Sequence, residues 1–136
     1  NSRYIEYARR KFGHRGTFYN QRVNNIVIED NLPFDIVLAD GILHHLSDEE
    51  AAELFTISHK ALYDTGFLFT ADPTLVENQG FVSRRISMMD RGRHVRPPQE
   101  YQRIAQKVFR QVEVHVVDKV SNRPQTGCFL KCYKIK

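Results

Sequence analysis

The sequence predicts a single α/β domain with a mostly parallel β-sheet, helical crossovers and an antiparallel strand pair at the end. Three observations lead to this fold class. The run FDIVLA at 34–39 is almost wholly apolar after Asp35, as in a parallel strand covered on both faces. Helical patterns alternate with this run and with later apolar runs, which is the order of β–α–β crossovers. The last two strand-like segments are separated only by a loop, which favours antiparallel pairing.

The composition is typical of a soluble globular protein. The chain has 136 residues, of which 41% are hydrophobic and 26% charged, enough for one core. Its apolar runs are far shorter than the ~20 residues that span a bilayer, and the N-terminus lacks the apolar segment of a signal peptide. We therefore expect residues 1–136 to form one domain of a cytoplasmic protein without membrane contact. Because the first residue is Asn, a fragment or a processed product is expected.

The charged residues and the two cysteines indicate which partners and which redox state to expect. The net charge of +4 is concentrated in arginines at 84–85 and 91–96, which indicates either a solvated face or an anion-binding patch. Nucleic acid is not expected, because no aromatic residues interleave these arginines. Cys128 and Cys132 lie four residues apart in one predicted strand, ~13 Å, too far for a disulfide. Both thiols are expected to be reduced.

The first half of the chain contains two helices and two strands in this interpretation. Apolar residues at helical spacing predict a helix that ends at Gly13. A strand is expected at 17–23 and a stronger one at 34–39. Ser47 and Glu50 form a capping box, so a second helix begins there and ends near YDTG at 63–66.

The second half follows the same logic. FLFTADP at 67–73 is an apolar strand that Pro73 stops, and a helix is expected within 77–90. A proline pair opens another helix, whose apolar stripe is expected in the core: Tyr101, Ile104, Ala105, Val108 and Phe109. QVEVHVVDKV and TGCFLKCYKIK then form the antiparallel pair. Ligands of such sheets bind outside the carboxyl ends of the strands, so residues 39–46 and 71–75 are expected at the site.

Residues 34–73, FDIVLADGILHHLSDEEAAELFTISHKALYDTGFLFTADP, resemble the second half of a class I S-adenosylmethionine-dependent methyltransferase. The motif LHHL before a helix, the Gly turn and the strand ending in Asp-Pro carry the likeness. The segment DRGRHVRPPQEY is similar to one found in some small-molecule methyltransferases. The resemblance implies a Rossmann-like sheet, S-adenosylmethionine as cofactor, and a small-molecule or sugar-containing methyl acceptor.

The chain departs from that family in one respect. The family binds its cofactor through a Gly-rich turn after the first strand, and none of the seven glycines here forms a G-x-G pair. The resemblance then implies a fold truncated at its N-terminus, without the first two strands and the helix between them. Open strand edges promote association, so a homodimer that fills the gap is a hypothesis.

The resemblance also places the cofactor contacts. The adenine loop maps to Arg22 and Val23, although a guanidinium cannot accept the hydrogen bond that the adenine amine offers. The methionine end maps to Ala39, Asp40 and Gly41, where a glycine permits close backbone approach. Gly41 alternatively serves only a tight exit from the strand.

The two histidines have two interpretations. His44 is the candidate general base for the acceptor, because imidazole titrates near neutrality. His45 is a candidate substrate contact, or a structural residue at the helix entry, and is expected to be the more buried of the two. Asp72 either orients the substrate or caps a turn. Arg91 and Arg96 are expected to hold an anionic substrate.

Two rival functions remain. One is a non-catalytic binding or assembly module that keeps the fold without a complete cofactor site. The other is a metal hydrolase that uses His44, His45 and Asp48, which is weaker because no further ligand cluster accompanies them. We therefore expect no metal site.

Overall fold

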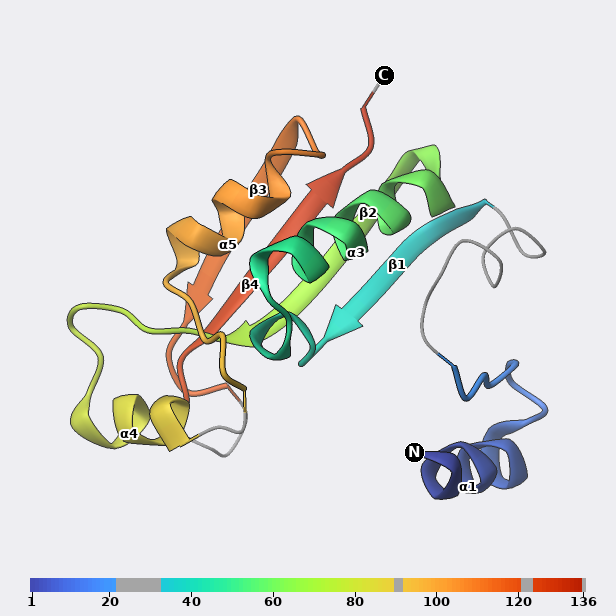
Figure 1. The fold of residues 1–136 in the computed structure, drawn as a ribbon, viewed down its shortest axis with the longest axis horizontal. Coiled ribbons are helices and arrows are strands. Elements are labelled where there is room, and N and C mark those ends of the chain that lie inside the picture. The colour runs from blue at the N-terminus through green and yellow to red at the C-terminus, as the bar shows by residue number, and fades with distance from the viewer. Residues whose placement is uncertain (22–32, 90–91, 121–123, 136) are drawn as a thin grey trace.

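The sheet has four strands in the order β1-β2-β4-β3 (Figure 1). A computed structural model describes residues 1–21, 33–89, 92–120 and 124–135. The strands are β1 Phe34–Asp40, β2 Leu62–Pro73, β3 Gln111–Val117 and β4 Gly127–Tyr133. β1 and β2 are parallel, and β4 is antiparallel to both of its neighbours, so β3 runs in the direction of β1 and β2. The predicted α/β sheet with an antiparallel final pair is confirmed.

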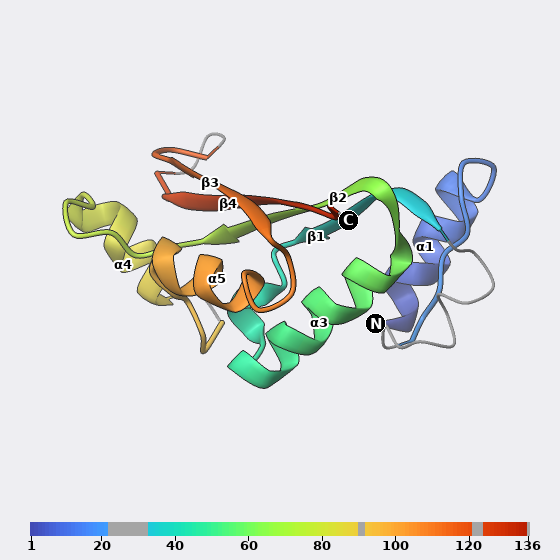
Figure 2. The ribbon, with the colours of Figure 1, turned by 90° about the horizontal axis from the view of Figure 1, so that it is seen from above.

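The helices cover one face of this sheet. Figure 2 shows α3 and α5 on the same side of the strands, with α4 beyond the end of the sheet and α1 beside the β1 edge. Within the described residues, no helix is both long enough and apolar enough to cross a membrane. The helices are α1 Ser2–Phe12, the 3-10 turn η1 Leu43–His45, α3 Asp48–Ala61, α4 Phe81–Met89 and α5 Pro98–Ala105.

The core lies between the sheet and the pair α3 and α5. The apolar stripe predicted for α5 is part of it, since Tyr101, Ile104 and Ala105 are all at most 2% exposed. Phe55 of α3 meets Phe109 edge-on, with ring centroids 6.3 Å apart. Cys128 and Cys132 are free and buried, and burial raises the pKa of each thiol to about 12. The remaining core members include Ala39, Leu43, Ala51, Leu62, Leu68 and Leu130.

The junction between α3 and β2 lies earlier than predicted. The helix was expected to continue to residues 63–66, but it ends at Ala61 and the strand begins at Leu62. The pairing of β1 with β2 is irregular here, because the register shifts between Phe34 and Ile36. Gly66 accommodates the close approach, since a Cβ there would lie 2.8 Å from the carbonyl oxygen of Asp35. The glycine therefore serves strand contact and not a helix end.

The strand predicted at 17–23 is wrong over its described part, residues 17–21, which adopt no strand. This segment folds back on α1, where Arg9 donates from Nε and Nη2 to the carbonyl oxygen of Phe18 at 2.9 and 2.7 Å. A carbonyl used in this way is not engaged in a strand ladder. α1 itself has no buried residue, although its end at Gly13 is as predicted.

Candidate active site

The carboxyl ends of β1 and β2 bring together the two segments that the sequence indicated. β1 ends at Asp40, and Gly41 follows with φ +63°, a left-handed conformation that favours glycine. The Gly41 amide donates to the Ala71 carbonyl at 2.8 Å, which ties the exit of β1 to the end of β2. The chain then enters η1, whose middle residue is His44. Gly41 thus turns the chain so that the histidine returns over the end of the neighbouring strand.

His44 and Asp72 form a buried pair at this edge. The imidazole Nδ1 lies 2.7 Å from Asp72 Oδ1, and the His44 backbone amide donates to the same oxygen at 3.1 Å. Their side chains are 6% and 2% exposed. An ionised carboxylate has no proton to donate, so Nδ1 carries the hydrogen and the basic lone pair is on Nε2. The pair therefore has the arrangement of a histidine base oriented by a carboxylate.

Two opposing effects act on the pKa of the Asp72 carboxyl group. Burial raises the pKa of its carboxyl group above the ordinary value of 3.8, while the hydrogen bonds from His44 act to lower it. Oδ1 takes these hydrogen bonds, whereas the buried Oδ2 has no partner among the described residues. A carboxylate in this state is costly to bury, and such groups concentrate at functional sites.

The prediction that His45 is the more buried histidine is wrong. His44 is 5% exposed, whereas His45 is exposed and lies against the His44 ring with centroids 4.0 Å apart. The 3-10 turn explains the difference, because its first two residues, Leu43 and His44, point into the protein. His45 therefore lies beside His44 on the solvent side, and its contact with substrate stays a prediction.

A cavity of about 230 Å³ lies in front of the pair. It brings two of the predicted cofactor residues, Asp40 and Gly41, next to His44 and Asp72, while Ala39 is buried in β1 behind them. The rest of the lining includes Gln125 and Thr126, which precede β4, and Phe129 within β4. Arg22 and Val23, which were assigned to adenine, lie outside the described residues.

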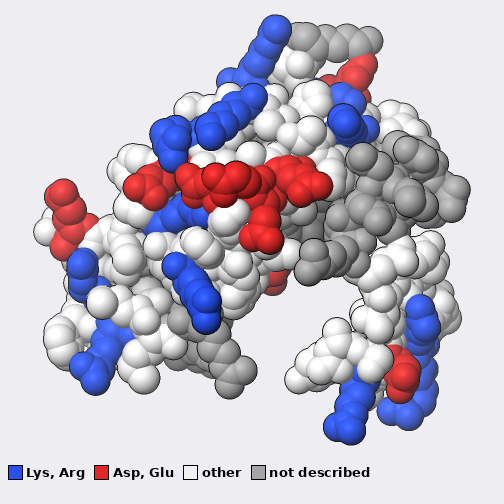
Figure 3. All heavy atoms as spheres, viewed as in Figure 1, with Lys and Arg blue, Asp and Glu red and all other residues white. Residues whose placement is uncertain are grey.

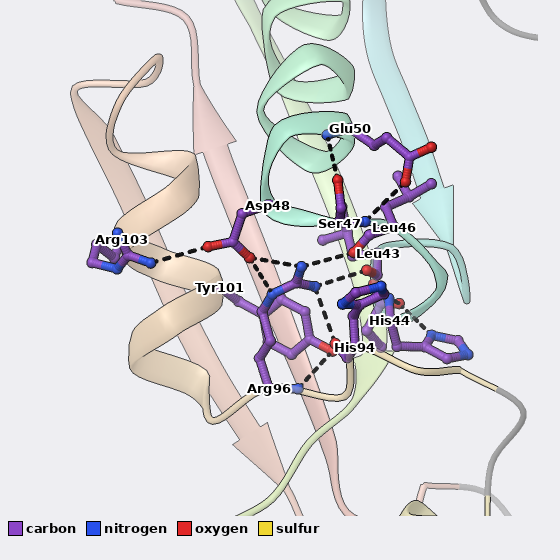
Figure 4. Close-up of polar contacts among 11 residues, drawn as sticks. Leu43, His44, Leu46, Ser47, Asp48, Glu50, His94, Arg96, Tyr101 and Arg103 are labelled. Atoms are coloured by element: carbon purple, nitrogen blue, oxygen red, sulfur yellow. Dashed lines mark hydrogen bonds and ion pairs between the residues drawn. The ribbon is translucent and has the colours of Figure 1, made fainter.

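The arginines divide into two groups. Arg84, Arg85 and Arg93 are exposed, as in a solvated basic face, and Arg91 lies outside the described residues. Arg96 differs, because it is 4% exposed and all five of its guanidinium N–H groups donate within the protein (Figure 4). This geometry favours an internal role for Arg96 over the substrate contact that the sequence suggested.

The packing of Gly92 on His44 and the pairing of Asp48 with two arginines were not predicted from the sequence. Gly92 packs so closely that a Cβ there would overlap the His44 ring and its carbonyl oxygen. Asp48 pairs with Arg96 and Arg103, at 2.8 and 3.2 Å, and the first hydrogen bond lowers its pKa. These contacts join positions about 50 residues apart, so no local pattern could have revealed them.

Acidic side chains gather at the start of α3. Its first turn carries Asp48, Glu49 and Glu50, and Figure 3 shows acidic side chains over this part of the molecule. They stabilise the positive end of the helix, and Ser47 with Glu50 makes the predicted capping box. Within residues 1–21, 33–89, 92–120 and 124–135, no three His, Cys, Asp or Glu side chains are placed to hold a metal ion.

Known structures share this fold, although neither a protein-family model nor a curated protein matches the chain. Human N-acetylserotonin methyltransferase in complex with SAM is similar at a TM-score of 0.63 and 16% identity, over 95% of this chain and 37% of the human one. A candidate O-methyltransferase of Nostoc punctiforme gives 0.56 and 16%, over 74% and 32%. The pyocyanin biosynthetic protein PhzM gives 0.57 and 18%, over 75% and 31%.

The similarity to these structures covers only part of their length and is low in sequence identity. The chain spans 31 to 37% of the length of these three neighbours. Identities of 16 to 18% establish the fold and not the activity. The fold that LHHL and its flanking strands implied is confirmed at this level. Over its four strands, the chain therefore has the fold of the S-adenosylmethionine-dependent methyltransferases.

Proposed function

We propose that this site transfers a methyl group from S-adenosylmethionine to a small-molecule or sugar-containing acceptor, with His44 as the general base. The observation that carries the proposal is the His44–Asp72 pair, with Nδ1 and Oδ1 2.7 Å apart at the carboxyl ends of two adjacent parallel strands. Ligands of open α/β sheets bind at this edge. An O–H acceptor is favoured, because loss of its proton makes the oxygen a stronger nucleophile and a histidine can take that proton.

The proposed roles follow from the geometry. The cofactor supplies an activated methyl group on a sulfonium ion. His44 accepts the acceptor proton at Nε2 as the new bond to carbon forms and the bond from sulfur to carbon breaks. Asp72 holds the Nδ1–H and stabilises the imidazolium that results, which is the role of a carboxylate behind a histidine base. S-adenosylhomocysteine and a methylated acceptor leave, and the proton passes from His44 to solvent.

The described residues fit one end of the cofactor. Asp40 and Gly41 line the cavity beside His44, and the left-handed Gly41 brings backbone to its wall without a Cβ. By resemblance these residues, with Ala39, hold the methionine end. The sequence has no G-x-G turn for the rest of the cofactor. The competing proposal, a binding module without catalysis, draws its support from that lack.

Labelled methyl transfer distinguishes these functions. The substrates are methyl-labelled S-adenosylmethionine and a panel of phenols, hydroxyindoles and sugars. We expect transfer to at least one acceptor, and a loss of about 10²- to 10⁴-fold in His44→Gln, which removes the base. Asp72→Asn is expected to lose rate as well, since it no longer stabilises the imidazolium. Equal rates in His44→Gln and the wild type would contradict the assignment of the base, and no transfer to any acceptor would favour the binding module.

We also propose that a second copy of the chain covers the outer side of β1, that is, the face of the strand turned away from α3 and α5. Ile36 and Leu38 are 51% and 71% exposed there, although an apolar run of this kind is typical of a strand covered on both faces. They continue into an aromatic row on the same side of the sheet, made of Phe67, Phe69, Phe129 and Tyr133. Contiguous apolar surface of this kind indicates an interaction site. Sedimentation equilibrium tests the homodimer: a concentration-dependent dimer supports it, and a monomer throughout would contradict it.

A further inference from the structure

The backbone of Arg96 is attached to the end of β2, the strand that carries Asp72. Thr74 Oγ1 donates to the Arg96 carbonyl at 2.8 Å, and the two residues form a parallel β-bridge. The Arg96 amide donates to Tyr101 Oη at 3.3 Å, and this hydroxyl donates in turn to the Pro73 carbonyl at 3.1 Å. Thr74 and Tyr101 are 0% and 2% exposed. Arg96 is thus attached to the two residues that follow the carboxylate that orients the base.

The side chain of Arg96 reaches the other half of the site. Its Nη1 donates to the Leu43 carbonyl at 2.9 Å and its Nη2 to the Leu46 carbonyl at 2.7 Å, on either side of the two histidines (Figure 4). His94, from the same segment, donates its amide to the His44 carbonyl at 3.0 Å. The carbonyls at the end of a helical turn need such donors, and a cation suits the negative end.

Asp48 fixes the guanidinium in this orientation. Its Oδ1 accepts from Nε at 3.0 Å and from Nη2 at 2.8 Å. Arg103 approaches the other oxygen of Asp48 from the solvent side at 3.2 Å. The buried cation is therefore paired, and its planar fork matches several acceptors at once, which a lysine could not do. The whole arrangement links η1, the start of α3, the end of β2 and the start of α5.

We propose that Arg96 is a positioning residue that sets the distance between His44 and Asp72. It acts as a brace with one end on the strand of the carboxylate and the other on the turn of the imidazole. The role rests on the proposed function, because it gains its purpose from a histidine base. Its contacts, however, can be tested without cofactor or acceptor. Arg96 does not itself meet the acceptor.

Nitrogen-15 NMR of the histidine side chains in the full chain tests the proposal. In the wild type we expect His44 to show a protonated Nδ1 and an unprotonated Nε2. Arg96→Met should lower the fraction of this tautomer and weaken the Nδ1–H signal, because the turn and the strand are no longer held together. Arg96→Lys keeps the charge with fewer donors, so it should give an intermediate loss. Arg103→Met is the matched control and should leave the His44 signals as in the wild type.

Two further variants separate positioning from general stability. Leu130→Ala weakens the core away from this brace and should not change the His44 tautomer. Thr74→Val removes one contact of the brace with little change in shape, and should reduce the Nδ1–H signal even where the Arg96 variants fail to fold. Unchanged His44 signals in Thr74→Val and in the folded Arg96 variants would overturn the proposal. Because NMR needs no methyl donor, absence of methyl transfer would contradict the proposed function and leave this result standing.

Discussion

The turn that carries His44 and the strand that precedes it differ in how completely the described chain encloses them. Arg96, His94 and Asp72 all donate or accept hydrogen bonds at the turn, and His44 is 5% exposed. β1, only a few residues earlier, presents Leu38 to solvent at 71%. The described residues thus enclose the His44–Asp72 pair at the carboxyl end of the sheet, but they leave Ile36 and Leu38 of β1 exposed. This contrast is the reason for the proposal that a second copy of the chain covers Ile36 and Leu38.

Substitutions in the core and on the exposed face of β1 should differ most in their effect on stability. Phe55 is fully buried, so Phe55→Ala should lower the free energy of unfolding by about 3–5 kcal/mol. Leu38→Ala should change it by no more than about 0.5 kcal/mol in the monomer, since that side chain is exposed. Urea denaturation measures both. If Leu38→Ala lowered the free energy of unfolding as much as Phe55→Ala, Leu38 would be buried in the monomer in solution. The difference between the core and the exposed face of β1 would then not exist.

Gly41, which joins β1 to the turn that carries His44, should show the next largest effect on stability. Gly41 has φ +63°, so Gly41→Ala should cost about 1–2 kcal/mol of stability. Among the described residues, a Cβ at this position would meet only His44 Cε1, at 3.9 Å, so the expected cost is conformational. Gly80→Ala is the control, because a Cβ there would meet no atom of the described chain within 4 Å. Equal stability of the two variants would show that the left-handed turn is not required.

The helix that leaves the turn should show a smaller effect. Ser47 Oγ accepts from the Glu50 amide at 3.3 Å, and Glu50 Oε2 accepts from the Ser47 amide at 2.9 Å. Ser47→Ala should therefore cost about 1 kcal/mol in thermal or urea unfolding. Glu53→Ala, at an exposed position within the same helix, should stay within about 0.5 kcal/mol. Similar losses in both variants would contradict the role of the cap.

The smallest effect concerns acid stability. The hydrogen bond from Arg96 holds the pKa of Asp48 below its ordinary value of 3.8. Ionised Asp48 therefore stabilises the fold above that value, and the contribution is lost as the pH falls through the lowered pKa. Because the side chain is 44% exposed, solvent should limit the effect to about 0.5 kcal/mol or less. We therefore expect the free energy of unfolding of Asp48→Asn to fall less steeply than that of the wild type as the pH is lowered below the ordinary pKa of Asp48. The same pH dependence in both proteins would contradict the pairing.

The sequence was most informative where a signal is local. The apolar run at 34–39, the capping box at Ser47 and the stripe through Tyr101 each depend on neighbours within a few residues, and each element is present. The rule that parallel strands share a carboxyl edge placed residues 39–46 and 71–75 together, but the pairing of His44 with Asp72 was not predicted. Nor was the distance of 2.7 Å between them.

Long-range contacts explain the remaining differences. Arg96 looked like a substrate-binding cation because a run of arginines carries no sign of which one turns inward. Its partners Leu43, Leu46 and Asp48 are about 50 residues away in the chain. The greater burial of His44 over His45 likewise depends on how η1 sits on β2. Residues 17–21 have strand-forming composition, but a strand also needs a partner strand to pair with, and the Phe18 carbonyl accepts from Arg9 instead.

Calorimetric titration of S-adenosylhomocysteine into the 136-residue chain tests whether the carboxyl end of this sheet binds the cofactor. Gly41→Val is the comparison, because a branched side chain would strain the left-handed turn and narrow the cavity beside His44. We expect saturable binding to the wild type and weaker binding to Gly41→Val. Absence of binding to the folded wild-type chain would contradict the claim that this edge of the sheet is a cofactor site.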